Sequence, residues 1–281
     1  MRAPTRWSAI IKLTHYSERT KELIPFAPRA LIVVMVQVAS SLFTLRREMV
    51  EIGRRMYERG LVVAAEGNIS ARLPEGNILI TPAGFCKGRM NPEDMVVVTP
   101  EGKRVQGNNR ASTELGMHLT ALGKRPDVRA AVHAHPPYAT AFAVAGIPLA
   151  DCILPEVVAT LGGVPLADYA TPSTPQVGAS IERYLDKFDA FLLKNHGVLT
   201  LGPDLESAFR KMETVERFAQ IIHLARSLGT VDEMTCKQVN DLLALTHNLH
   251  SRFSGAETPV CGHCHVGTGP SPSNMPSGYG S

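Results

Sequence analysis

Three histidines are spaced so that they can hold one metal ion. His133 and His135 lie two apart in the apolar segment 129–135, which predicts a β-strand. Residues two apart on a strand face the same side, so both imidazoles can reach one ion from a rigid support. His196 lies between two further apolar segments, where a polar side chain often faces a cleft. Three histidines leave one coordination position open, as in catalytic zinc sites. The His133/His135 pair alone is weak evidence for a metal site, and without His196 two hydrogen-bonded histidines on a solvated strand would be the better interpretation.

A carboxylate and two hydroxyls precede a predicted helix over 113–122. Ser112, Thr113 and Glu114 stand where the helix begins. Free backbone amides at a helix N-terminus bind anions, and the two hydroxyls would add donors. A plain helix cap fits the same three residues, so both interpretations stay open.

The remaining pattern predicts one α/β domain with a mixed or antiparallel sheet between helix layers. Strands and helices mix without strict βαβ alternation. Asp204 is placed to cap a long helix that ends at Gly229. The expected strands are 69–73, 78–81, 95–99, 129–135, 190–194 and 198–201, and the other expected helices are 42–56 and 136–145.

Four segments are expected along the chain. Residues 1–37 form an N-terminal extension, 38–229 the catalytic domain, 230–253 a C-terminal helix, and 254–281 a disordered tail rich in glycine, proline and serine. The tail contains Cys261-Gly262-His263-Cys264-His265. A single Cys-x-x-Cys lacks the second ligand pair of a zinc site, so an incidental or weak metal-binding role is favoured.

Composition excludes several classes of function. The net charge is +3 and 20% of the 281 residues are charged, so no dense basic face for nucleic acid is expected. The apolar run 30–39 is shorter than the ~20 residues that a membrane span needs, and it lies too far from residue 1 for an export signal. Five irregularly spaced cysteines predict reduced thiols. We therefore expect a cytoplasmic protein without a membrane partner.

Five short motifs occur together between about 42 and 229. They are Gly67-Asn68-Ile69-Ser70, Ile80-Thr81-Pro82-Ala83-Gly84, Ser112-Thr113-Glu114, His133-Ala134-His135 and Asn195-His196-Gly197. In order and spacing this segment resembles the class II aldolase/adducin-head family. The combination is far more specific than any one motif.

The resemblance implies a fold, a metal and a reaction. It implies one Zn²⁺ (or Mn²⁺ or Fe²⁺) per subunit on His133, His135 and His196, and Glu114 as the acid/base. It implies a homotetramer with active sites between neighbouring subunits. The implied substrate is a small phosphorylated sugar, a ketose 1-phosphate cleaved to dihydroxyacetone phosphate and an aldehyde. The implied phosphate-binding residues are Asn68, Ala83, Gly84, Ser112 and Thr113.

Two further positions are catalytic candidates. Glu156 stands where an aldolase of the family has a tyrosine proton donor, counted back from Gly162-Gly163. A second carboxylate near the metal would suit dehydration, whereas Pro155-Glu156 would also suit a helix start. Tyr169 lies in a segment that itself resembles the aldolases. Lys87 and Arg89 follow the Ala83-Gly84 turn. Two interpretations are open, attraction of the substrate phosphate and solvated surface charge, and the second is favoured.

Other functions remain open within the family. They are dehydration of methylthioribulose 1-phosphate and decarboxylation of a 3-oxo-tetronate 4-phosphate. Epimerisation of a pentulose phosphate is disfavoured, because the epimerases carry aspartate where Glu114 stands. An adducin-like interaction module is the non-catalytic alternative. Such modules keep the fold without the metal site, and here all three histidines are present.

Overall fold

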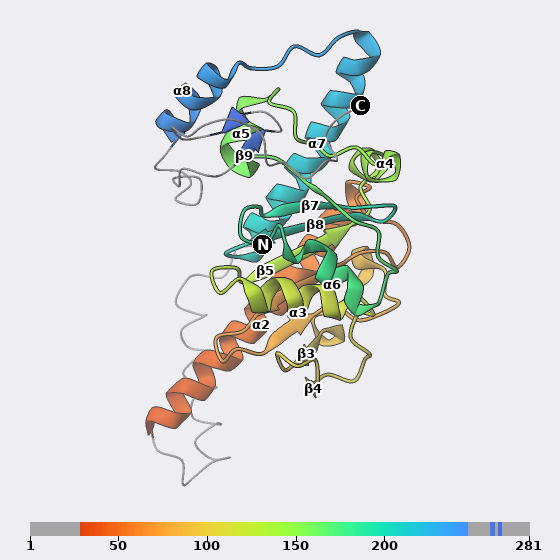
Figure 1. Cartoon of the computed structure of the whole chain (residues 1–281). Helices are drawn as coiled ribbons and strands as arrows, with labels where there is room; N and C mark the ends of the chain where they lie inside the picture. Colours follow the sequence, from red (N-terminus) through yellow and green to blue (C-terminus); the bar gives the residue numbers. More distant parts are fainter. Residues whose placement is uncertain (1–28, 247–258, 262–263, 266–281) are drawn as a thin grey trace, which may run out of the picture. The chain divides into compact units, whose positions relative to one another are not determined.

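The computed structural model describes residues 29–246, 259–261 and 264–265 (Figure 1). The chain divides into two compact units, 1–43 and 44–281, and every site residue discussed below belongs to the second. Within the described ranges, no helix has both the length and the apolar character to cross a membrane. Most of the expected N-terminal extension and C-terminal tail falls outside these ranges, and the domain boundaries stay predictions.

A mixed sheet forms the centre of the second unit. Its eight strands run in the order β4-β3-β2-β1-β5-β8-β7-β6. Neighbouring strands are antiparallel except β6 and β7, which are parallel. The expected sheet type is therefore confirmed. The strands are β1 (Asn68–Arg72), β2 (Ile78–Ile80), β3 (Val96–Val98), β4 (Arg104–Gln106), β5 (Ala130–Ala134), β6 (Leu166–Ala167), β7 (Ala190–Leu193) and β8 (Gly197–Gly202).

Helices and 3-10 turns lie before, between and after these strands along the chain. They are α2 (Arg29–Glu58), α3 (Leu115–Lys124), α4 (Pro137–Ala145), α5 (Pro155–Leu161), α6 (Pro175–Glu182), α7 (Leu205–Leu228) and α8 (Cys236–Thr246), with the 3-10 turns η1 (Lys87–Arg89) and η2 (Pro92–Asp94). A further pair of strands, β9 (Pro259–Cys261) and β10 (Cys264–His265), lies within the expected tail.

The alternation of side chains along the central strands assigns the helices to two faces. Ala131 on β5 and Leu199 on β8 pack into one apolar core with residues of α3 and α6, which lie side by side in Figure 1. Thr200 has the opposite parity, and its hydroxyl donates to the carbonyl of Ala208 in α7 over 2.8 Å. Helix α7 therefore covers the other face. His133 shares the parity of Ala131, so its side chain lies on the α3 face.

Most expected elements are present, with shifted ends. Asp204 caps α7 as predicted, and its carboxylate accepts from the Ser207 amide over 2.6 Å. The expected C-terminal helix is present as α8, and its predicted end lies beyond the described residues. Helix α6 was not predicted, and α5 was anticipated only by the interpretation of Pro155-Glu156 as a helix start. Each has only two turns and begins with a proline, so neither offers a long enough apolar period.

The prediction of reduced thiols is wrong for two cysteines. Cys152 and Cys236 are disulfide-bonded, whereas Cys86 is free. Folding brings their segments together, since the Met234 amide donates to the Cys152 carbonyl over 2.8 Å. Cys152 also shares a buried apolar cluster with Val158 and Val239. Residues so far apart in the sequence give no signal in the spacing of cysteines.

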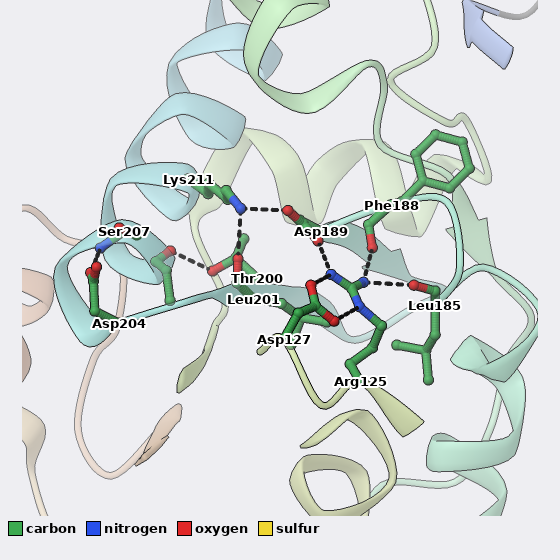
Figure 2. A network of polar contacts seen from close by, with 11 residues as sticks. Arg125, Asp127, Leu185, Phe188, Asp189, Thr200, Leu201, Asp204, Ser207 and Lys211 are labelled. Atoms are coloured by element: carbon green, nitrogen blue, oxygen red, sulfur yellow. Dashed lines mark hydrogen bonds and ion pairs between the residues drawn. The ribbon is translucent and has the colours of Figure 1, made fainter. Parts of the chain in front are cut away.

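A polar network joins the strand ends far from the histidines (Figure 2). The buried guanidinium of Arg125 donates to the Leu185 and Phe188 carbonyls and to Asp189, over 2.6, 3.2 and 2.7 Å. Lys211 in α7 donates to the other Asp189 oxygen over 2.6 Å. The cationic groups of Arg125 and Lys211 are therefore both paired with the Asp189 carboxylate, which offsets the cost of removing them from water. The network fixes the start of β5, at whose other end His133 and His135 lie.

Candidate active site

The three predicted histidines converge. His133 is fully buried near the end of β5, His135 follows that strand, and His196 precedes β8. One ring nitrogen of each lies within 4.8 Å of the other two. The His133 and His135 Nε2 atoms are 3.1 Å apart. The three side chains therefore lie close together, as predicted.

The donor set fits a divalent ion. His133 Nδ1 lies 2.8 Å from the Val198 carbonyl oxygen, which can only accept, so Nδ1 carries the proton. The lone pair of Nε2 then points at the other two rings. Metal-bound histidines are oriented in the same way by a second hydrogen bond. Three nitrogens with one open side match a catalytic rather than a structural site.

The turn before β8 is shaped for this convergence. Asn195 adopts a left-handed backbone with φ of 57°, which asparagine tolerates better than most residues. A Cβ on Gly197 would lie 2.5 Å from the Ala134 carbonyl oxygen and 2.6 Å from the His135 ring. Only glycine lets β8 begin this close to His135. The left-handed backbone of Asn195 and the absence of a side chain at Gly197 together place His196 in the cluster.

Glu114 lies directly beside the histidines. Its Oε2 is 3.2 Å from His133 Nε2 and its Oε1 is 3.0 Å from His196 Nε2. The Asn68 side-chain amide donates to Oε2 over 2.8 Å. Burial raises the pKa of the carboxyl, but the neighbouring histidines in their protonated form and the hydrogen bond from Asn68 outweigh burial and lower the pKa below its usual value. Glu114 is therefore ionised and can accept a proton.

A buried chain of polar groups holds Asn68. Its side-chain oxygen lies 2.5 Å from His118 Nε2, and His118 Nδ1 lies 2.6 Å from the Ser70 hydroxyl. Because His118 must donate to the Asn68 oxygen, the Asn68 NH₂ group is turned toward Glu114. Burial lowers the pKa of His118 to about 3, so its ring is neutral. His118 was not predicted from the sequence.

His135, His196 and Glu114 border a cleft of about 350 Å³. All five predicted phosphate-binding residues line it, namely Asn68, Ala83, Gly84, Ser112 and Thr113. The Ser112 hydroxyl accepts from the Glu114 amide over 3.3 Å, so its own proton remains available to an anion. A methyl group on Gly84 would meet nothing within 4 Å, so its backbone faces open space. The Ala83 amide already donates to the Arg110 carbonyl over 2.9 Å.

Known proteins share this fold and sequence. The family model for the class II aldolase and adducin N-terminal domain matches residues 47–223, which is more than half of the chain. A 3-oxo-tetronate 4-phosphate decarboxylase of Pectobacterium atrosepticum is 33% identical over 64% of this chain and 84% of its own length. An L-fuculose phosphate aldolase of Methanococcus vannielii is 34% identical over 64% and 97%. A solved L-fuculose 1-phosphate aldolase is 30% identical, covers 72% and 95%, and superposes with a TM-score of 0.67.

The chain belongs to the class II aldolase and adducin family. It is a metal-dependent enzyme of that family, and the predicted family and fold are confirmed. The relatives include both aldolases and decarboxylases, so family membership leaves the particular reaction open.

Two predicted catalytic residues of this family member lie apart from the cleft. Glu156 is exposed in the first turn of α5, and Tyr169 is 59% exposed after β6. Neither is among the residues of the same chain that line the cleft. The interpretation of Pro155-Glu156 as a helix start agrees with α5, which begins at Pro155. The catalytic roles of both residues stay predictions.

Three residues of the cleft were missed or misread. Glu66 lies 3.6 Å from His135 Nδ1, on the side of the ring away from the other histidines. Ser173 lines the cleft in a left-handed backbone with φ of 65°. Lys87 also lines the cleft and is buried, so its interpretation as a solvated surface charge is wrong. A strained non-glycine backbone marks functional sites, but φ is not visible in a sequence.

Proposed function

We propose that this enzyme cleaves a ketose 1-phosphate into dihydroxyacetone phosphate and an aldehyde. The observation that carries the proposal is the position of Glu114, an ionised carboxylate in contact with two of the three clustered histidines and at the border of the cleft. We further propose one Zn²⁺, Mn²⁺ or Fe²⁺ per subunit on His133, His135 and His196. When bound, such an ion supplies Lewis-acid polarisation of a substrate carbonyl.

The residues of the chain itself bind the phosphate and transfer the proton. The hydroxyls of Ser112 and Thr113, the backbone at Gly84 and the Asn68 amide bind the phosphate. Cleavage breaks one carbon–carbon bond, the aldehyde fragment loses its hydroxyl proton, and the three-carbon fragment gains a proton on carbon. We assign both proton transfers to Glu114: its carboxylate accepts the hydroxyl proton as the carbon–carbon bond breaks and then delivers that proton to the carbon of the three-carbon fragment, so the carboxylate is regenerated. The hydrogen bond from Asn68 holds its carboxylate in one orientation, which general acid/base catalysis requires.

The test is product analysis with paired variants. Wild type, given a panel of ketose 1-phosphates, should release dihydroxyacetone phosphate. Glu114→Gln keeps the shape of the side chain but removes the base, so the turnover number should fall by roughly 10²–10⁴. Metal content should survive, because three histidines remain. Glu156→Gln serves as the matched control and should cost much less.

Two other activities of the family give different products. A 3-oxo-tetronate 4-phosphate decarboxylase would release CO₂, and relatives of that name are 33% identical to this chain. A methylthioribulose 1-phosphate dehydratase would release water and leave the carbon chain intact, and Glu156→Gln should then be the more damaging change. If no sugar phosphate is consumed and no metal is bound, an adducin-like interaction module becomes the better explanation.

A further inference from the structure

Lys87 is a buried cation at the edge of the cleft. Its side chain is among the largest that are fully buried, with the residue only 1% exposed, yet it lines the cleft beside Gly84 and Ser112. Two residues further on, Arg89 is exposed and does not line the cleft. Burial of a lysine is rare, because an ammonium loses its hydration. Such a group calls for an explanation.

The ammonium of Lys87 joins the two loops that form the cleft wall. Nζ donates to the Ala65 carbonyl over 3.2 Å and to the Phe85 carbonyl over 2.6 Å. Ala65 lies in the loop before β1, and Phe85 follows Gly84. From behind, a Cβ on Gly53 of α2 would lie only 2.6 Å from the Lys87 carbonyl oxygen, so the helix backbone fixes this residue closely. An ammonium has three N–H groups, and two have these partners.

The charges around the cleft make Lys87 distinctive. Of the described residues that line the cleft, Lys87 alone is a lysine or arginine, and two others are the carboxylates Glu66 and Glu114. Burial lowers the pKa of Lys87 to about 8, although Cys86 and Glu114 favour its charged form. It therefore remains largely protonated near neutral pH. Two carbonyls could be satisfied by a neutral donor, so hydrogen bonding alone does not account for a charge here.

We propose that Lys87 is the cation of the phosphate subsite, with its third N–H donating to a phosphate oxygen of the sugar phosphate. The other two N–H groups keep the loops of Asn68 and Gly84 at the spacing that the phosphate needs. A charge-assisted hydrogen bond to a phosphate is about twice as strong as a neutral one, which compensates the cost of burying the ammonium. This inference rests on the proposed function, because it presumes a phosphorylated substrate.

The test compares two probes that differ only in the phosphate. Dihydroxyacetone phosphate and dihydroxyacetone are titrated calorimetrically into metal-loaded wild type, Lys87→Met and Lys87→Gln, with Arg89→Met as the matched control. We expect Lys87→Met to weaken binding of the phosphorylated probe by about 10- to 100-fold, the usual effect of losing a hydrogen bond to a charged group. Binding of dihydroxyacetone should change less than about twofold. Arg89→Met should match wild type for both.

Each other outcome is decisive. Lys87→Gln keeps amide donors for the two carbonyls without the charge, so it should behave like Lys87→Met. If it binds dihydroxyacetone phosphate as wild type does, or if both probes weaken equally, Lys87 only holds the loops and the inference fails. Failure of both variants to fold with their metal also assigns it a structural role. If wild type itself does not prefer the phosphorylated probe, the proposed function is at fault instead.

Discussion

At the scale of residues, the metal assignment can be tested at His135. His133 is buried and hydrogen-bonded to Val198, whereas the His135 side chain is partly exposed and lies 3.6 Å from Glu66. His135→Ala leaves two nitrogen ligands, too few for tight binding. Elemental analysis should find about one metal ion per wild-type chain and a small fraction of that in the variant. Full occupancy in His135→Ala would show that the ion is held elsewhere.

The site residues that can be predicted from the sequence share one property: each belongs to a motif of a few neighbouring residues. The His133/His135 spacing, the Ser112-Thr113-Glu114 helix start and the family motifs each lie within a few residues. Lys87 and Arg89 lie two residues apart in the same short segment, yet Lys87 is buried with its ammonium bonded to the Ala65 carbonyl, whereas Arg89 is exposed. Such a difference arises from contacts between distant segments, so no short window of sequence contains it.

At the scale of elements, the buried chain through His118 connects α3 to β1. His118 on α3 contacts both Asn68 and Ser70 on β1, and Asn68 is the cross-strand partner of His133. One helix and two strands therefore share the geometry around Glu114. The apolar periodicity that predicts α3 treats position 118 as one more buried residue. The sequence therefore predicts the helix, but it does not predict the polar contacts that His118 makes with β1.

The buried hydrogen-bonded chain of Ser70, His118 and Asn68 should make the stability of the fold sensitive to acid. The pKa of His118 is about 3 in the folded protein, below its usual 6.5, so protons favour the unfolded state. The stability that the neutral ring contributes is fully present above pH ~6.5 and is lost as the pH falls toward ~3. Urea unfolding of metal-free protein should show a smaller loss between about pH 7 and pH 5 for His118→Gln than for wild type, by about 1–2 kcal/mol. Equal losses would mean that other groups govern the acid sensitivity.

At the scale of the whole molecule, the positions of Glu156 and Tyr169 bear on assembly. Both are exposed and outside the cleft of their own chain. If the enzyme is a homotetramer with active sites between subunits, as we propose, these residues can serve a neighbouring cleft. Light scattering should then give a mass of four times the 30.4 kDa chain. An exposed tyrosine that acts only in a neighbour's site is a position that neither the sequence nor one chain can assign.

Complementation between two impaired variants tests this directly. Glu114→Gln removes the base from a cleft, and Tyr169→Phe removes the hydroxyl that we propose serves the adjacent cleft, so each homotetramer should be slow. In tetramers that mix the two variants at random, roughly a quarter of the clefts receive an intact Glu114 from one subunit and an intact Tyr169 from the next. Turnover of co-refolded protein should therefore rise well above the average of the two variants, while unmixed tetramers combined in the cuvette stay at that average. If co-refolding gives no gain, Tyr169 acts within its own chain or the subunits do not share sites. If Tyr169→Phe alone turns over like wild type, Tyr169 has no catalytic role.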